Sequence, residues 1–500
     1  MLKSNLIANF FGQAWIAFMG FAFVPLYIKY MGLEAYGLIG IFAVLQAWLG
    51  LLDIGMTPAL GRQMALFTGG AGGEKFIRDL LRTIELIGAI LSGVLIIGVG
   101  LGADWLSENW VHTDSLSNNT VSEAFVVMGA VAGMRLIETI YRSALIGLQR
   151  QVLFNLISMG IATVRGAGAV GVLIWTSPTI TNFFLWQLII SILSLSILGI
   201  ATYASLPKGA VRGNISFKAI KSVWHFSAGM MAITLLSLLL AQLDKVLLIR
   251  LVNLTEFGIY MLASSIAGVI FMLVGPVTQA FYPRICQFYG KGDLIGLANT
   301  FQTASQMVAV IAGSFAIMLI FFSEQILSIW THDSRLSAQA APILSLLIFG
   351  NLINGIMLVP YQAQLAYEWT SLSIKLNIFA LLILLPALII IIPRFGAVGA
   401  ALVWILLNFF YLFFGANLMY RRILASEKFA WYRYGVFQPI ILGSLFILLC
   451  KYMFPIPVDD FLITFFYLAS TFFMLLTLLS ATSPNIMRAV LALLKDTRAL

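Results

Sequence analysis

Two stretches of ten residues decide how this chain is organised: Ile28-Lys29-Tyr30-Met31-Gly32-Leu33-Glu34-Ala35-Tyr36-Gly37 and Ile249-Arg250-Leu251-Val252-Asn253-Leu254-Thr255-Glu256-Phe257-Gly258. They match in register at an offset of 221 residues, with an isoleucine, a basic residue, a leucine, an aromatic residue and a glycine recurring in place. Asn155 and Asn377 fit a nearly equal offset of 222. The alternative to an internal repeat is chance matching among apolar segments.

Around these stretches the chain is far too apolar for a water-soluble fold. Of its 500 residues, 61% are hydrophobic and 10% are charged, whereas soluble domains carry about 25% charged residues. Runs of about 20 apolar residues, each long enough to cross a bilayer, recur along the whole chain. The sequence therefore predicts an all-α polytopic membrane protein with about 14 transmembrane helices. The expected spans are 7–28, 36–59, 83–103, 121–147, 152–176, 181–206, 223–250, 257–283, 303–330, 339–366, 371–393, 396–419, 434–454 and 461–480.

The repeat period covers six of these spans, an even number, so its two copies have the same orientation in the membrane. We therefore expect two six-helix lobes in parallel pseudo-repeat, followed by a C-terminal helix pair. The expected domains are the first lobe 1–206, a basic cytoplasmic linker 207–222, the second lobe 223–430, the two extra helices 431–480 and a cytoplasmic tail 481–500.

Lysines and arginines are distributed unevenly between the two sides of the predicted membrane. With the N-terminus in the cytoplasm, 21 of the 29 fall inside, 5 fall outside and 3 fall within spans. This bias follows the positive-inside rule and places both termini in the cytoplasm. The net charge of +9 is spread over short loops without interleaved aromatic residues, so nucleic acid is not an expected partner.

Little in the sequence indicates a metal or a bound cofactor. The two cysteines fall on opposite faces of the predicted membrane, and the three histidines lack metal-ligand spacing. The chain contains no G-x-x-x-x-G-K-[ST] loop for ATP. We expect no cofactor and no metal, and transport coupled to a gradient of H⁺ or Na⁺ or to substrate flux.

Several N-terminal motifs are shared with a known family. They are Asn9-Phe10-Phe11-Gly12, the stretch from Val24-Pro25-Leu26-Tyr27 through Gly37, Leu51-Leu52-Asp53-Ile54-Gly55-Met56, and Arg62. With these motifs and its six-plus-six-plus-two layout, the chain resembles the polysaccharide-transporter family. That family is a branch of the superfamily that also holds multidrug extruders and lipid II flippases.

The resemblance implies a function as well as a fold. It implies a V-shaped pair of lobes around a central cavity, working by alternating access in the bacterial inner membrane. The implied cargo is an undecaprenyl-pyrophosphate-linked oligosaccharide, an O-antigen or other surface polysaccharide unit, moved to the outer leaflet. The implied partners are this cargo, membrane lipids and other membrane proteins of polysaccharide assembly.

Charged residues within the first lobe are the main candidates for substrate binding. Arg135, Glu138 and Arg142 fall within about 60° of one face of a helix, and Arg165 lies near the middle of the next span. Buried charges in a membrane usually face a cavity or a partner, and guanidinium groups match phosphate and carboxylate. The alternative is internal pairing of Glu138 with Arg135 and Arg142.

The second lobe offers mostly neutral candidates for the substrate cavity. The expected residues are Asp244, Lys245, Arg284, Asn351, Asn354 and Gln362. Asp244 and Lys245 are adjacent, so they point about 100° apart on a helix and need not pair. The alternatives are a topology anchor for Arg284 and interhelical hydrogen bonds for the amides.

Candidate residues for coupling and for hinge motion are fewer. Asp53 and Glu138 are candidate ion-coupling carboxylates, although Asp53 is equally suited to capping a helix or pairing with Arg62. Pro276 and Pro360 fall inside spans, where a proline removes a helix hydrogen bond and permits a kink. We expect hinges at these two positions.

Three rival functions remain open on sequence grounds. A drug extruder or a lipid II flippase of the same superfamily is the first, although an extruder of cationic drugs should expose acids rather than bases. A membrane glycosyltransferase or polymerase is disfavoured because the sequence lacks a D-x-D pair and a large outer loop. A membrane scaffold is disfavoured as well, because it would gain nothing from buried arginines. We therefore expect a transporter and not an enzyme.

Overall fold

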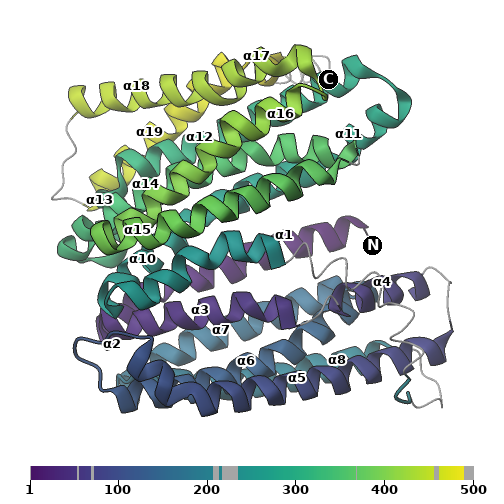
Figure 1. Cartoon of the computed structure of the whole chain (residues 1–500), viewed down its shortest axis with the longest axis vertical. Coiled ribbons are helices and arrows are strands. Elements are labelled where there is room, and N and C mark those ends of the chain that lie inside the picture. The colour runs from purple at the N-terminus through teal and green to yellow at the C-terminus, as the bar shows by residue number, and fades with distance from the viewer. Residues whose placement is uncertain are drawn as a thin grey trace. The chain divides into compact units, whose positions relative to one another are not determined.

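The computed structural model describes residues 2–52, 56–68, 73–206, 213–216, 235–367, 369–454 and 461–488. These residues are almost entirely helical (Figure 1), and within them the only β-type pairing is an isolated bridge between His112 and Asn253. The chain divides into two compact units, Met1–Gly258 and Ile259–Leu500.

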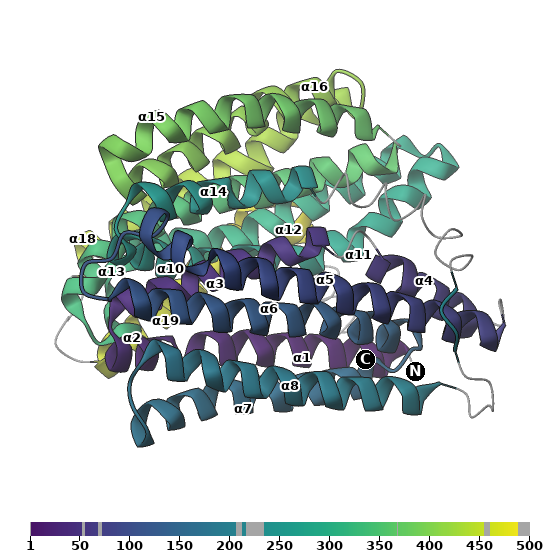
Figure 2. The same ribbon diagram turned by 60° about the horizontal axis from the view of Figure 1, so that its bottom comes forward.

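Unit 1 is a bundle of long helices that run nearly parallel (Figures 1 and 2). Within it α6 packs against both α5 and α8, and α1 packs against α7. Fully buried Leu60, Leu80 and Ile84 contribute to a core where α4, α5 and α6 meet. Its helices are α1 Leu2–Ala22, α2 Val24–Met31, α3 Leu33–Leu52, α4 Met56–Thr68, α5 Glu74–Asn109, α6 Asn118–Gly147, α7 Gln151–Trp175, α8 Ile180–Ser205, the helical stretch 235–251, and the beginning of α10 Leu254–Ala267.

Unit 2 is built around α12 and α14, which pack against each other and against α11. The final helices α18 and α19 pack on α12 through a core that includes Phe322, Ile447 and Leu475. The elements are the end of α10, α11 Val269–Lys291, α12 Leu294–Phe321, α13 Ser323–Thr331, α14 Ser334–Ala366, α15 Thr370–Phe410, η1 Tyr411–Gly415, α16 Ala416–Tyr420, η2 Ala425–Glu427, α17 Lys428–Ala430, η3 Trp431–Phe437, α18 Gln438–Met453 and α19 Phe461–Thr482.

The prediction of an all-α polytopic membrane protein is confirmed. In the described part of the chain, eleven helices are long and apolar enough to cross a membrane, and the shorter apolar helix Leu33–Leu49 is additional. Gly396, with φ 57° and ψ −140°, breaks the helical geometry inside α15, between the spans expected at 371–393 and 396–419. That backbone conformation is nearly exclusive to glycine. The full count of fourteen spans stays a prediction.

The predicted domain boundaries are only partly visible. Of the linker 207–222 the structure describes 213–216, where the Asn214 N–H donates to Asp79 Oδ1 at 2.7 Å and the Ser216 N–H donates to Thr83 Oγ1 at 2.9 Å. Both contacts fasten this part of the linker to α5. The division between the compact units falls later, at Gly258, so the expected lobe boundary stays a prediction.

The two matching decapeptides contact each other inside unit 1. A Cβ atom added to Gly37 would lie 2.5 Å from the carbonyl oxygen of Leu254, and one added to Gly258 would lie 2.7 Å from that of Leu33. The offset of 221 that relates the decapeptides maps each of these contacts onto the other. Such a reciprocal contact is what two equivalent segments make across a two-fold axis. Glycine is needed at both positions because any side chain would displace backbone.

Glu34, in the first decapeptide, holds the loop between α5 and α6. Its carboxylate accepts the N–H groups of Asp114 at 2.7 Å, Ser115 at 3.0 Å and Leu116 at 3.4 Å, and it also accepts the Ser115 hydroxyl. Burial by itself raises the pKa of Glu34, but these hydrogen bonds outweigh it and lower the pKa. The carboxylate is therefore ionised at neutral pH.

The second decapeptide holds the same loop. The Leu254 N–H donates to the His112 carbonyl at 2.8 Å, and the Thr255 hydroxyl donates to Asp114 Oδ2 at 3.2 Å. We call Glu34, residues 112–116, Leu254 and Thr255 the α5–α6 loop network. Both copies of the repeat are thus joined to one loop.

Substitution of Glu34 by alanine is expected to release this loop, because three backbone N–H groups lose their acceptor. Hydrogen exchange at Asp114, Ser115 and Leu116 should accelerate at least about tenfold, while exchange in mid-α6 stays unchanged. Since the pKa is depressed, the stabilisation is present above the ordinary glutamate pKa of about 4.3 and is lost only as pH falls through the lower folded value. Unchanged exchange at these amides would contradict the role of Glu34.

Candidate substrate site

A cluster of charges lies near the middle of α6 and α7. Arg135 and Glu138 stand one turn apart on α6, and Arg165 Nη2 of α7 lies 4.0 Å from Glu138 Oε1. The hydroxyl of Ser194 in α8 hydrogen-bonds the Glu138 carboxylate. The side chains of Arg165 and Glu138 are only 22% and 16% exposed, so three helices bring two guanidinium groups and one carboxylate together in a largely buried place.

Much of the hydrogen-bonding capacity of this cluster is unused. Arg135 places its Cζ 5.2 Å from the centre of the Phe42 ring of α3. Among the described residues, buried Arg135 Nε, Arg165 Nε and Nη2, and Glu138 Oε1 have no hydrogen-bond partner. Two positive charges face one negative charge, and unpaired buried donors are costly. An anionic group would supply the missing acceptors and balance the charge.

Neighbouring polar groups on α3 and α8 extend the cluster. Gln46 follows Phe42 by one turn, and Ser191 precedes Ser194 by one turn. Gln46 Nε2 and Ser191 Oγ are likewise buried without a hydrogen-bond partner in the described structure. A neutral amide and a hydroxyl beside two guanidinium groups suit a ligand that carries both negative charge and hydroxyl groups.

Arg142 does not join this cluster, although it was expected on the same face. It is exposed, and its Cζ lies 5.4 Å from the centre of the Phe154 ring. Glu138 forms its ion pair with Arg165 rather than with Arg135 or Arg142. The expected stripe therefore divides into a buried pair and an exposed arginine, and the predicted cavity-lining role of each residue stays a prediction.

The amides expected to bind sugar join helices of unit 2. Asn351 of α14 donates to the Ala267 carbonyl and accepts from Trp404 Nε1, both at 2.8 Å. Asn354 donates to Asn408 Oδ1 of α15 at 2.7 Å. These are the interhelical hydrogen bonds that stood as the alternative to sugar binding. Gln362, further along α14, is half-buried.

The remaining charged candidates of the second lobe differ in exposure. Lys245 Nζ lies 3.4 Å from both carboxylate oxygens of Asp244, so the two residues pair although a helix points them apart. The reason is the long lysine side chain, which turns back and also donates to the Ala241 carbonyl. Arg284 is exposed near the end of α11.

The expected hinges lie within continuous helices. α11 runs through Pro276 and α14 runs through Pro360, whereas the described helices are interrupted at Phe23, Gly268 and Gly396. Hinge motion at the two prolines stays a prediction. Asp53 lies outside the described residues.

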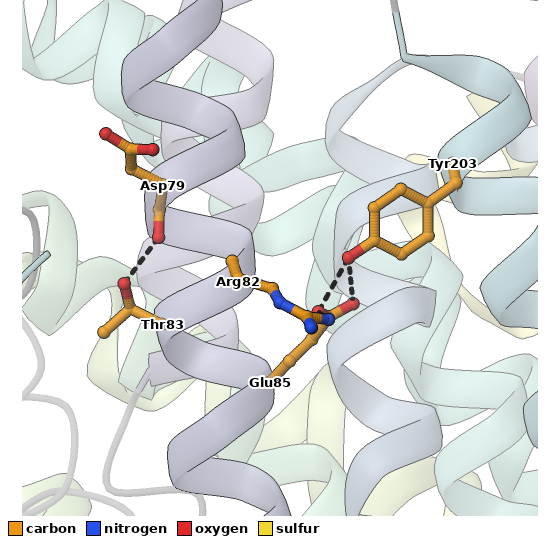
Figure 3. A network of polar contacts seen from close by, with 5 residues as sticks. All are labelled: Asp79, Arg82, Thr83, Glu85 and Tyr203. Carbon is orange, nitrogen blue, oxygen red and sulfur yellow. Dashed lines mark hydrogen bonds and ion pairs between the residues drawn. The ribbon is translucent and has the colours of Figure 1, made fainter. Parts of the chain in front are cut away.

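A buried carboxylate outside the set of expected site residues, that of Glu85, joins α5 to α8 (Figure 3). Glu85 of α5 is 9% exposed and accepts the Tyr203 hydroxyl of α8 at 2.7 and 2.9 Å. Arg82 Nη1 donates to it at 3.4 Å, and the Tyr141 hydroxyl of α6 also bonds to it. The sequence gives no sign of this meeting because its members are up to 118 residues apart.

Comparison with known proteins identifies the family to which the chain is related. The family model described as "Polysaccharide biosynthesis protein" matches residues 2–289, and a second model, MatE, matches residues 227–391. A putative O-antigen transporter of Shigella flexneri is 17% identical over 404 residues, which are 80% of this chain and 93% of that protein.

Solved structures share the fold at low sequence identity. The lipid II flippase MurJ in an inward closed conformation has a TM-score of 0.68 and 13% identity, covering 94% of this chain and 97% of that one. An inward-facing multidrug resistance MATE transporter has a TM-score of 0.64 and 14% identity, covering 85% and 96%. Because the first family model covers more than half of its length, the chain belongs to the polysaccharide biosynthesis protein family, and it is a multi-pass membrane transporter rather than an enzyme.

Proposed function

We propose that the chain moves an undecaprenyl-pyrophosphate-linked oligosaccharide, an O-antigen or another surface polysaccharide unit, from the cytoplasmic to the outer leaflet by alternating access. Family membership and the similarity to a putative O-antigen transporter support this proposal. The proposed location is the bacterial inner membrane with both termini in the cytoplasm, as the distribution of basic residues indicates.

The observation that carries the proposal is the pair of buried arginines in unit 1 whose hydrogen-bond donors are partly unused. Arg135 and Arg165 hold buried N–H groups without acceptors, and a single carboxylate opposes them. Both residues lie near the middle of their helices, where desolvation makes an uncompensated charge expensive. A cargo with a pyrophosphate and acidic sugars offers the acceptors, and guanidinium groups bind such anions in bidentate geometry.

The ion that drives transport is proposed to act at Glu138. Its carboxylate faces Arg165 and has one oxygen without a hydrogen bond. Binding of H⁺ or Na⁺ there would weaken the hold on Arg165 and leave the guanidinium for the cargo. Collapse of the corresponding gradient should then stop export in intact cells, whereas a cargo-driven flippase would continue.

Complementation tests the proposal directly. A host that lacks its surface-polysaccharide flippase but makes the matching lipid-linked glycan would receive the wild-type chain, an Arg135→Gln/Arg165→Gln variant, or Arg150→Gln as an exposed control. The wild type and the control should restore surface glycan. The double variant should restore at least about tenfold less at equal expression, since charge-assisted hydrogen bonds contribute about 1.5–3 kcal/mol each.

The other outcomes separate function from site. Full restoration by the double variant would keep the function but remove the arginines from the substrate site. Failure of the wild type, with correctly inserted protein and a matched glycan, would turn attention to another cargo.

A lipid II flippase is the second candidate function, because the similar MurJ structure is one and its cargo would also be anionic. Rescue of growth in cells depleted of their lipid II flippase, without restoration of surface glycan, would favour it. The basic surplus of the cluster disfavours an extruder of cationic drugs.

A further inference from the structure

The connection between α16 and η3 carries a concentrated positive charge. We call residues 421–433 the basic segment. It contains Arg421, Arg422, Lys428 and Arg433 and only one acid, Glu427. Gln302 Nε2 of α12 donates to Glu427 Oε2 at 3.0 Å, and in the described structure this carboxylate forms no ion pair with the arginines. Lys428 donates to the neutral amide oxygen Oδ1 of Asn417 at 2.6 Å, so three arginines and one lysine face one acid and the segment carries a net charge of +3.

These arginines are exposed, and two of them are oriented by aromatic rings. Arg422 Cζ lies 4.8 Å from the centre of the Trp369 ring, and Arg433 Cζ lies 5.0 Å from that of Tyr434. In the described structure none of the three forms an ion pair with a carboxylate. Stacking uses the flat face of a guanidinium group and leaves the N–H donors at its edge for a phosphate.

An apolar side chain stands out beside the arginines. Phe429 is 76% exposed, and its residue position lies between the arginine pair and Arg433. An exposed aromatic ring among basic residues is the pattern of a segment that lies in the membrane interface. The left-handed conformation of Leu424, with φ 52°, reverses the chain between the arginine pair and Phe429.

From this arrangement we propose that the basic segment binds anionic phospholipid from the leaflet that it faces. Arg421 and Arg422 take the headgroup phosphate, and Phe429 enters the acyl boundary. The positive-inside bias places this segment at the cytoplasmic leaflet, whose anionic lipids attract basic residues next to membrane helices. The site is separate from the cluster on α6 and α7 and involves a resident lipid rather than the transported one.

Native mass spectrometry of the purified full-length chain with phosphatidylglycerol and with phosphatidylcholine tests the site. Wild-type protein should retain phosphatidylglycerol preferentially. Arg421→Gln/Arg422→Gln should weaken that binding by about fivefold per arginine, and added salt should weaken the wild-type binding in the same direction. Arg421→Lys/Arg422→Lys should recover part of the loss because the charge returns without the bidentate fork.

Two further variants keep the test decisive. Arg394→Gln removes an exposed arginine that the charge distribution places on the opposite face, and it should leave phosphatidylglycerol binding unchanged. Phe429→Ser removes the ring without altering charge, and it should weaken binding of both lipids. Equal binding by the wild type and the Arg421/Arg422 glutamine variant would overturn the site, as would an equal loss in Arg394→Gln.

Discussion

Alanine at Gly37 is expected to destabilise the purified chain by about 1–3 kcal/mol, the usual cost of overpacking a well-filled contact. The new Cβ would lie 2.5 Å from the Leu254 carbonyl oxygen, so two backbone segments must separate. Gly258→Ala should cost a similar amount, because its Cβ would lie 2.7 Å from the Leu33 carbonyl oxygen. Thermal unfolding in detergent measures both effects.

Gly98→Ala is the matched control. Gly98 is an exposed helical glycine of α5, and a Cβ added there would have nothing within 4 Å, so alanine should be neutral or stabilising by up to about 1 kcal/mol. The double variant Gly37→Ala/Gly258→Ala should cost less than the sum of its singles, because one separation relieves both clashes. Strict additivity, or a melting temperature for Gly37→Ala equal to that of the control, would argue against the reciprocal contact.

Glu85→Ala is expected to have the second large effect, a loss of about 3 kcal/mol of unfolding free energy. The substitution removes the acceptor of the Tyr203 and Tyr141 hydroxyls, and a hydrogen bond to a charged group contributes about 1.5–3 kcal/mol. Because the three helices α5, α6 and α8 share this carboxylate, its loss loosens all of them together. Chemical or thermal unfolding of the purified chain reports the difference.

Comparison variants distinguish a shared acceptor from a general charge effect. Glu123→Ala removes an exposed glutamate from α6 and should change stability by less than about 0.5 kcal/mol. Tyr203→Phe should cost roughly 1 kcal/mol, and it should cost almost nothing once Glu85 is already alanine. If Glu85→Ala behaves like Glu123→Ala, the junction has no energetic role.

The fold could be predicted because membrane-spanning helices are recognisable in a sequence by their length and composition. Apolar runs of about 20 residues match the thickness of a bilayer and seldom occur in soluble domains. The matching decapeptides predicted an internal repeat, and their contact with each other is visible only in the structure. A break between two spans was expected near Gly396. The kink itself was not predicted, because its only mark in the sequence is a single glycine.

The candidate site was harder to predict because helical periodicity describes one helix at a time. It placed Arg135, Glu138 and Arg142 on one face, yet the partner of Glu138 comes from α7 and Arg142 instead contacts Phe154. From the sequence, Asn351 and Asn354 could equally bind sugar or form interhelical hydrogen bonds. Their hydrogen bonds with Trp404 and Asn408 are visible only in the structure. Which helices face each other is a tertiary property that a local pattern does not contain.

The α5–α6 loop network has a consequence for how the protein is made. The first compact unit ends at Gly258. Leu254 and Thr255, which hydrogen-bond the α5–α6 loop, are among the last residues of this unit. During synthesis helices α1 to α8 are therefore complete before the residues that close this network exist. A ribosome that stalls just before residue 254 would leave a nascent bundle whose loop is held by Glu34 alone, and such a chain should be recognised and degraded faster than one that has passed Gly258.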